Sequence, residues 1–305
     1  MRQPLVSIIT VNYNQTKVTC DMLESVKKLT YPAVEVIVVD NGSQENPEQK
    51  LKEVLPSTRV IRSEVNLGFA GGNNLGIKIA SGEFLFFVNN DTVLTPNIIE
   101  NLLNPFRQFE NMGIVSPKIY YYDTPHTIQY AGYTRINPCT ARNRTIGQFE
   151  RDHGQYEKPH PVPYAHGAAM MVSRKVIEKV GPMPEFFFLY YEEFDWCEQV
   201  RKAGFEVYYE PKAKIYHRES VSIGALSPLK TYYLTRNRIL FMRRHAGELN
   251  FALFTVFLVL FTIPKNLLSY ILCGQWRQAR AFVKGIIWNI RHHSAETTSQ
   301  HPANA

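Results

Sequence analysis

Short apolar runs alternate with helix-type stretches through the first 110 residues, and this alternation constrains the fold more than any other feature. The runs predict buried strands at residues 5–11, 34–40, 59–64 and 83–89. Apolar residues at helical spacing predict helices between and after them, at residues 16–29, 46–55, 71–80 and about 95–110. Strict alternation of this kind predicts an α/β fold, with a mostly parallel sheet flanked by helices on both faces.

The pattern changes after residue 112. Residues 113–121, 130–136 and 161–173 predict further strands, but irregular, proline-rich connections separate them. We therefore expect a second half that is less regular than the first. The last residues, 293–305, have no apolar pattern and predict a disordered tail.

The basic character of the chain is concentrated in its last third. The formal net charge is +7, yet residues 211–305 contain 13 Lys and Arg against 3 Asp and Glu. Such an excess predicts a polyanionic partner. Because no nucleic-acid-binding motif accompanies the charge, DNA and RNA are the weakest candidates, and an anionic membrane surface is favoured.

An apolar segment adjoins this charge. Only Lys265 is charged within residues 249–273, but the uninterrupted run 251–263 is shorter than the roughly 20 residues that a spanning helix needs. Because Pro264 interrupts the run, we expect residues 246–292 to form a re-entrant or interfacial helix pair, with flanking basic residues on the lipid headgroups. A buried core helix or a homo-oligomer contact is the alternative.

Polar side chains follow three of the predicted strands. Asn12 and Asn14 follow the first, Asp40 ends the second, and the Asn-Asn-Asp run at 89–91 ends the fourth. Ligands of open α/β sheets bind beyond the carboxyl ends of the strands, so these groups predict one shared crevice. Each set alone is more typical of a turn, but all three together favour a site.

A glycine-rich stretch, NLGFAGGNNLG at residues 66–76, lies between the third and fourth strands. Its glycines allow a close backbone approach to a ligand at the start of a helix, which suits a diphosphate or a sugar. The stretch matches neither the dinucleotide-binding fingerprint nor the P-loop. A dinucleotide enzyme and a P-loop ATPase are therefore both disfavoured.

The motifs VSIITVNYN, VVDNGS, NLGFAGGNN and FVNND, in this order, resemble the family 2 glycosyltransferases. HGAAMMVSRKVIEKVG, FFFLYYEEFDWCEQVRKAGF and YYLTRNRILFMRRH extend the resemblance, and the bacterial rhamnosyltransferase-like subgroup is the most similar. The resemblance covers roughly residues 4–245. It implies a GT-A domain at residues 1–245, with a nucleotide-binding half at about 1–112 and an acceptor half at about 113–245.

The resemblance also implies a nucleotide-sugar donor and the residues that bind it. Asp40 would accept a hydrogen bond from the base imide, which fits UDP or dTDP better than a purine nucleotide. The donor-site residues that it implies are Asn12, Asn14, Asn66, Gly68, Phe69, Asn73, Asn89 and Asn90. Arg236 and Arg238 would reach the diphosphate or a phosphate of the acceptor, although a basic helix face near the membrane is nearly as good an interpretation.

A divalent cation, Mn²⁺ or Mg²⁺, is a further implication. Asp91 would be the metal-binding carboxylate of the family's DxD-like motif, and hard cations of this kind favour oxygen ligands. The first position of the motif is Asn89 here, a departure that weakens the metal site. His217 would be the second metal ligand, and its alternative is a surface histidine at a strand end.

The acidic stretch at 192–198 holds the candidate catalytic base. Inversion by single displacement needs one carboxylate to take the proton of the acceptor hydroxyl. The resemblance implies Glu193, where relatives carry Asp, and Asp195 is the alternative base. His166, Gly167 and Glu192 would line the acceptor side. The plain alternative is a helix N-terminus, where acidic side chains are favourable.

These observations predict an inverting, membrane-associated glycosyltransferase that transfers a sugar to a glycan or lipid-linked acceptor in cell-surface polysaccharide synthesis. A sugar nucleotidyltransferase and a non-catalytic sugar-nucleotide-binding scaffold are the alternatives. The four cysteines lack the spacing of zinc or disulfide frameworks, and the sequence enters a strand pattern at once. We therefore expect the cytoplasmic face of the inner or plasma membrane.

Overall fold

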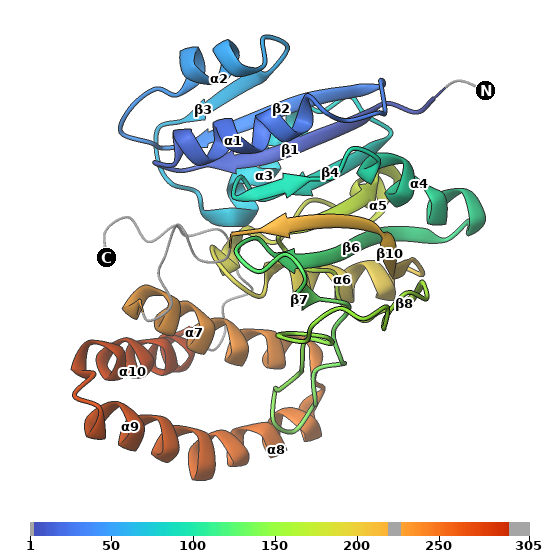
Figure 1. Ribbon diagram of the computed structural model, residues 1–305. Helices are drawn as coiled ribbons and strands as arrows, with labels where there is room; N and C mark the ends of the chain where they lie inside the picture. Colours follow the sequence, from blue (N-terminus) through green and yellow to red (C-terminus); the bar gives the residue numbers. More distant parts are fainter. Residues whose placement is uncertain (1–2, 219–226, 293–305) are drawn as a thin grey trace.

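The nucleotide-binding half has the predicted alternation. The computed structural model describes residues 3–218 and 227–292, so the predicted tail lies outside the described residues. The first four strands are β1 (Val6–Asn12), β2 (Val34–Asn41), β3 (Arg59–Ser63) and β4 (Phe84–Val88). The helices that connect them are α1 (Thr16–Val26), α2 (Glu48–Val54) and α3 (Gly68–Ile79) (Figure 1).

These four strands are parallel and lie in the order β3-β2-β1-β4. Right-handed crossovers place α1 and α2 on one face of the sheet, and α3 on the other because the chain reverses direction after β3. The reversal makes the carboxyl ends of β1 and β4 a topological switch point, where ligands of such sheets bind. The register pairs Asn12 with Asp40, so two predicted site residues are neighbours across the sheet.

The acceptor half adds a mixed extension to this sheet. The complete order is β3-β2-β1-β4-β9-β6-β10-β5, and β9 is antiparallel to both β4 and β6. Its elements are β5 (Thr92–Leu94), α4 (Ile98–Gln108), β6 (Met112–Tyr121), β7 (Ile128–Tyr130), β8 (His160–Pro161), β9 (Ala169–Ser173), α5 (Arg174–Val180), the short helix η1 (Glu185–Phe187), α6 (Glu192–Lys202) and β10 (Glu206–His217).

Two strands predicted in this half are wrong over most of their length. The predicted strand 130–136 is reduced to the end of β7 at Tyr130, and the predicted strand 161–173 is in strand form only at Pro161, in β8, and from Ala169 onward, in β9. Residues 131–136 pair instead with the far arm of a hairpin, as in the bonds Ala131 N–Ile146 O and Thr134 N–Arg144 O, each 2.9 Å. Alternating apolar residues there pack against the core without joining the sheet, which periodicity alone does not distinguish.

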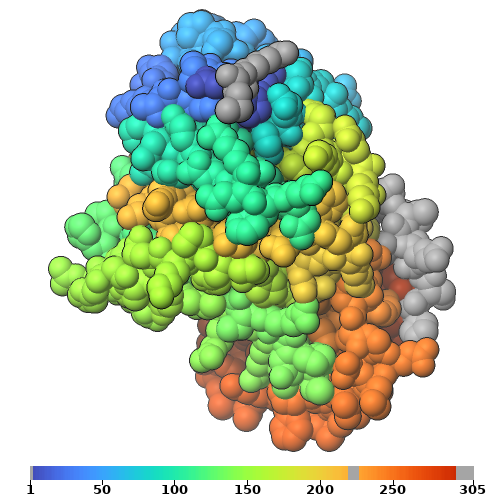
Figure 2. All heavy atoms as spheres, turned by 90° about the vertical axis from the view of Figure 1, so that its right-hand side faces the viewer, coloured from blue at the N-terminus to red at the C-terminus, as the bar shows by residue number. Residues whose placement is uncertain are grey.

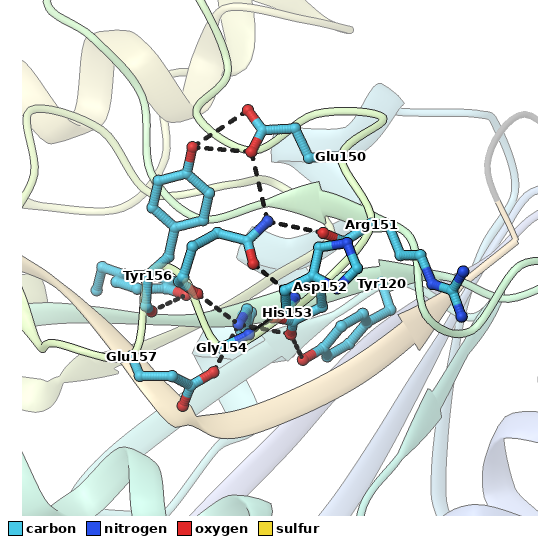
Figure 3. Close-up of polar contacts among 11 residues, drawn as sticks. Tyr120, Glu150, Arg151, Asp152, His153, Gly154, Tyr156 and Glu157 are labelled. Carbon is cyan, nitrogen blue, oxygen red and sulfur yellow. Dashed lines mark hydrogen bonds and ion pairs between the residues drawn. The ribbon is translucent and has the colours of Figure 1, made fainter.

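A buried lysine holds the 150–157 segment against β6. The Lys118 ammonium is completely buried and lies 2.7 Å from carboxylate oxygens of both Asp152 and Glu157. Tyr120 donates a 2.5 Å hydrogen bond to Asp152, and Figure 3 shows these two side chains facing each other while Arg151 points away. A buried charge needs such partners, so this polar cluster fixes the segment that carries it.

The C-terminal part is a stack of helices below the sheet (Figure 1). It comprises α7 (Pro228–His245), α8 (Glu248–Phe257), the π-helical turn η2 (Leu258–Thr262), α9 (Ile263–Leu272) and α10 (Trp276–Arg291). Residues 248–272 form one continuous helix, because the π-helical turn directly precedes Pro264 and accommodates its missing N–H. This helix is the one within the described residues that is long and apolar enough to cross a membrane, by length and composition only.

Most of that helix is exposed. Its most apolar stretch has a mean hydropathy of 1.9, and only 17% of that stretch is buried within the protein. Leu260 and Phe261 are about 60% exposed, at 61% and 60%. The buried-core alternative for residues 249–273 therefore fails for this face of the helix.

Candidate active site

The carboxyl ends of β1 and β2 form one polar cluster. The Asn12 amide donates to Asp40 Oδ1 at 2.9 Å and to Ser43 Oγ at 3.2 Å, and its oxygen accepts from Thr19 Oγ1 at 2.8 Å. Asn12 and Asp40 are both fully buried. Asn14, at a positive φ of 52°, closes the turn by accepting from the backbone N–H of residue 44 at 2.9 Å. Buried amides in this state are fully bonded, so the cluster has a fixed shape.

Asp40 keeps acceptor capacity in this cluster. Arg62 Nε lies 3.2 Å from Asp40 Oδ2, but the geometry is not that of a hydrogen bond, and Oδ2 has no hydrogen-bond partner among the described residues. A buried carboxylate oxygen without a donor calls for a ligand that supplies one. Ser43 accepts from Asn12, and Arg62 forms the ion pair, so both help to orient this carboxylate. Neither was predicted as a site residue.

The glycine-rich stretch is folded tightly against the same cluster. Asn66 Oδ1 accepts the N–H of Gly68 at 2.9 Å. Gly68 has a φ of +75°, which favours glycine, and a side chain there would also overlap the backbone oxygen of Phe188. Asn41, not predicted as a site residue, donates to Asn66 Oδ1 and to Gly68 O, each at 3.0 Å. The turn is thus fixed to the end of β2.

Phe69 and Asn73 lie in the first turns of α3. The Phe69 N–H donates to Phe188 O at 2.8 Å, and the Asn73 amide donates to Phe69 O at 2.9 Å. These bonds connect the helix start with the 185–191 segment, which leads directly into the acidic stretch. The predicted donor-side and catalytic segments are therefore neighbours in the fold, although about 120 residues separate them.

The Asn-Asn-Asp run follows β4 at the switch point. The Asn89 N–H donates to Ala168 O at 2.9 Å, and the Asn90 amide donates to Thr19 Oγ1 at 3.0 Å. Asp91 is 8% exposed, and its Oδ1 lies 3.1 Å from His217 Nε2 at the end of β10. The two predicted metal ligands are therefore adjacent. Among the described residues, no group of three or more His, Cys, Asp or Glu is arranged to hold a metal ion.

Gln129 on β7 sets the tautomer of His217. The distance between His217 Nδ1 and Gln129 Oε1 is 2.9 Å, and a carbonyl oxygen can only accept, so Nδ1 carries the proton. His217 then turns Nε2 toward Asp91 Oδ1, which has no hydrogen-bond partner among the described residues. Two electron-pair donors at this distance need a cation or a proton between them.

His166 and Gly167 lie between this pair and the acidic stretch. The ring centroids of His166 and His217 are 6.2 Å apart, and Gly167 lies against Glu193, where an added Cβ would come 3.7 Å from the carboxyl carbon. Burial, and then the nearby His217, lower the pKa of His166 to about 3, so its imidazole is neutral near pH 7. Its Nδ1 accepts the Ala168 N–H at 3.0 Å.

The two glutamates at the start of α6 have raised pKa values. Burial raises the pKa of Glu193 to about 7. Burial, and then repulsion by Glu193, raises the pKa of Glu192 well above its ordinary value, and Glu192 Oε2 has no hydrogen-bond partner among the described residues. A carboxylate that gains and loses a proton near neutral pH is suited to general-base chemistry.

Asp195 lies in a different environment. Its Oδ1 accepts from Arg244 Nε at 2.7 Å and from His245 Nε2 at 2.6 Å, and its Oδ2 accepts from Gln199 Nε2 at 2.6 Å. Burial alone would raise the pKa of Asp195, but the hydrogen bonds from His245 and Arg244 lower it. Residues two apart on a helix point in different directions, so Asp195 faces α7 and not the Gly167 side.

Comparison with known proteins identifies the family. Residues 7–181 match the family model described as glycosyl transferase family 2. The chain belongs to this family. The match includes every predicted donor residue from Asn12 to Asn90 and also Asp91, but it ends before α6 and α7.

Relatives of this family 2 glycosyltransferase include hexosyl- and rhamnosyltransferases. A low-salt glycan biosynthesis hexosyltransferase, Agl10 of Haloferax volcanii, is 29% identical over 77% of this chain and 74% of the relative. The dTDP-rhamnosyl transferase RfbF of Shigella flexneri is 27% identical over 77% and 81%. An N-acetylglucosaminyl-diphospho-decaprenol L-rhamnosyltransferase of Mycobacterium tuberculosis is 24% identical over 71% and 77%. The predicted rhamnosyltransferase-like resemblance is confirmed.

Solved structures show the same fold. The mannosyltransferase PcManGT of Pyrobaculum calidifontis, in complex with GDP-Man and Mn²⁺, superposes with a TM-score of 0.57 at 13% identity and covers 95% of this chain and 88% of its own. GalNAc-T7 with UDP, GalNAc and Mn²⁺ gives 0.60 at 15% identity, over 70% of this chain but only 43% of its own. The predicted GT-A fold is confirmed.

The two predicted phosphate-binding arginines of the transferase are both engaged on α7. Arg236 is 3% exposed, donates to Phe186 O, and lies 4.4 Å above the Trp288 ring of α10. Arg238 Nε donates to Tyr191 Oη at 3.2 Å. These contacts favour the structural interpretation of both residues over contact with a phosphate.

Asn237, which the sequence analysis missed, holds the 185–191 segment in place. Its amide donates to the backbone oxygens of Phe187, Leu189 and Tyr190, at 3.0, 2.7 and 2.8 Å. Three residues in this segment, Phe188, Tyr190 and Tyr191, have positive φ angles, which are unfavourable without such support. The one sequence signal for Asn237 was its place inside the TRNR motif, because a lone asparagine in a helix has no other distinguishing pattern.

Proposed function

We propose that this family 2 enzyme is a metal-dependent, inverting transferase that moves a sugar from a UDP- or dTDP-sugar to a glycan or lipid-linked acceptor in cell-surface polysaccharide synthesis. The observation that carries the proposal is the position of Glu193. Its carboxylate, with a pKa of about 7, lies against Gly167, and the next residue, His166, lies beside the Asp91–His217 pair. The proposed base and the proposed metal-ligand pair thus lie on either side of His166 and Gly167.

The donor would bind along the ends of β1, β2 and β4. Asp40, with one oxygen lacking a hydrogen-bond donor, would accept the N3–H of uracil or thymine. The glycine-rich stretch, with Gly68 at its turn, would follow the diphosphate, because a backbone without side chains permits close approach. The proposed preference for a pyrimidine base rests on this hydrogen bond. The donor screen described below identifies the sugar.

Asp91 and His217 fit a divalent cation. Their facing atoms are 3.1 Å apart, close to the separation of roughly 3.0 Å between adjacent corners of an octahedron with bonds of about 2.1 Å. When bound, Mn²⁺ or Mg²⁺ would neutralise charge on the leaving nucleoside diphosphate. Gln129 holds the His217 ring in the tautomer that a metal ligand needs.

Glu193 would act as the general base. The acceptor hydroxyl oxygen attacks the anomeric carbon, the bond from that carbon to the diphosphate oxygen breaks, and the hydroxyl proton moves to the Glu193 carboxylate. Attack from the face opposite the leaving group inverts the configuration. Glu192, held protonated by its raised pKa, would leave Glu193 as the charged member of the pair.

The exposed apolar face of residues 248–272 would place the enzyme on the cytoplasmic surface of the membrane. Leu260 and Phe261 project from it, and Arg277, Arg280 and Lys284 follow in α10. An apolar face with adjoining basic residues suits an anionic lipid surface. This arrangement brings the enzyme to a lipid-linked acceptor.

A donor screen tests the proposal. Purified protein would be incubated with UDP- and dTDP-sugars and Mn²⁺ or Mg²⁺, with and without EDTA, while nucleoside diphosphate release is measured. We expect release from one donor, its loss with EDTA, and its loss in Asp91→Ala but not in Asp123→Ala, a matched control at an exposed loop position. If no donor is turned over and calorimetry detects no binding, the scaffold alternative replaces the enzyme.

A further inference from the structure

A hairpin in the acceptor half connects the proposed active site with the exposed apolar helix. Residues 133–145, here called the basic hairpin, are closed by the bonds Thr134 N–Arg144 O at 2.9 Å and Asn137 N–Arg142 O at 2.8 Å. A β-bridge pairs Tyr133 with Thr145 at its base. These bonds make the hairpin a defined element, although it belongs to neither the sheet nor the helical stack.

The base of the basic hairpin lies at the proposed reaction centre. The Tyr133 ring stacks on the His166 ring, with centroids 5.8 Å apart and an interplanar angle of 6°, and contacts the Phe194 ring edge-on at 5.2 Å. His166 and Phe194 are the neighbours of Gly167 and Glu193 in the chain. A ligand lying along the hairpin would therefore end beside the proposed base.

The tip of the basic hairpin lies at the helical stack. The Arg142 guanidinium is 5.3 Å from the centroid of the Phe257 ring, at the end of α8. Figure 2 shows the green atoms of this part of the chain directly against the orange atoms of the C-terminal helices. The hairpin thus runs from the face that we assign to the membrane up to the crevice.

The basic hairpin is purely cationic. Residues 124–149 contain no Asp or Glu, and Arg135, Arg142 and Arg144 are all exposed. The nearest carboxylates in the chain are those of Asp123 and Glu150, and Glu150 already accepts from Tyr156. Three exposed arginines on one short hairpin, with no acidic residue in that stretch of the sequence, favour a concentrated negative charge as the ligand, and arginine can bind two phosphate oxygens at once.

We propose that the basic hairpin binds the diphosphate of an acceptor whose glycan is linked through it to an isoprenoid lipid. The inference rests on the proposed function and specifies its acceptor class. The position of the hairpin supports the diphosphate over lipid headgroups, because one end reaches His166 and only the tip reaches the apolar helix. The lipid would stay with that helix, the diphosphate would lie on the arginines, and the terminal sugar would reach Glu193.

Binding of farnesyl diphosphate by the full-length protein in detergent tests this directly. We expect the triple variant Arg135→Gln/Arg142→Gln/Arg144→Gln to raise its Kd by at least about ten-fold, because charge-assisted hydrogen bonds are lost. The matched control Lys28→Gln/Lys50→Gln/Lys52→Gln removes the same charge from exposed sites on and next to α1 and α2, far from the hairpin, and should leave the Kd unchanged (Figure 1). Farnesol should bind both proteins equally.

Two further measurements separate the outcomes. An unchanged Kd in the arginine variant overturns the inference. If that variant still binds farnesyl diphosphate but no longer binds phosphatidylglycerol vesicles, the inference is also overturned, because the hairpin would then bind lipid headgroups. Acceptor-free nucleoside diphosphate release should be equal in parent and variant. If the parent itself neither releases nucleoside diphosphate nor binds a donor, the proposed function fails, while the farnesyl diphosphate result still decides the role of the hairpin.

Discussion

The pH dependence of transfer gives the sharpest test of Glu193. A base with a pKa of about 7 is roughly 10% ionised at pH 6 and roughly 90% ionised at pH 8, so kcat/KM should rise about nine-fold between them. A glutamate with an ordinary pKa near 4.3 would already be almost fully ionised at pH 6 and would give a flat profile. The size of the rise therefore reports the burial of this one carboxylate.

The assay follows nucleoside diphosphate release at subsaturating donor and acceptor from pH 6 to pH 8. Glu193→Gln should lower kcat/KM by about 10²–10⁴-fold, the usual contribution of a general base, and should abolish the rise. Glu178→Gln, an exposed site on α5, is the matched control and should keep the parent profile. A rise that persists in Glu193→Gln, or a flat profile in the parent, would refute the assignment.

Three further predictions concern the parts that support the site. Lys118→Met should lower the free energy of unfolding by about 3 kcal/mol, because the carboxylates of Asp152 and Glu157 lose their positively charged partner. Urea denaturation at pH 7 measures this. Gly68→Ala should abolish donor binding measured by calorimetry, since its φ of +75° and the backbone of Phe188 exclude a side chain, whereas unchanged affinity would contradict the described turn. Leu260→Ser/Phe261→Ser should release the protein from anionic vesicles in a flotation assay while acceptor-free donor turnover continues.

The regular half of the fold could be predicted from the sequence because its elements alternate strictly. Residues 34–40 and 83–89 are predominantly apolar runs, and each became a strand within one or two residues of its predicted ends. The predicted strand at 130–136 failed because its residues bond to the far arm of a hairpin that closes after residue 144. Such pairing depends on turn geometry, which a single sequence does not specify.

The candidate site was predictable where it lies at strand ends. Asn12 and Asp40 are in contact as the parallel register requires, because equal positions on neighbouring strands meet at one edge. The resemblance implied Glu193 as the base and left Asp195 as the alternative, since both are acidic residues in one helical turn. Only the partners supplied by Arg244 and His245 distinguish them, and α7 brings those partners from about 50 residues away.

Helix α7 has a consequence for which acceptors can be used. Its Asn237 hydrogen-bonds to the segment before the proposed base, and its Arg244 forms an ion pair with α6. Its Arg236 packs against a ring of α10. The proposed base is therefore held in place by α7, at a fixed height above the apolar helix (Figure 1). Such an enzyme would select acceptors by the length of their glycan. A glycan that is too short or too long for that height would not place its end at the carboxylate, even if its terminal sugar were correct.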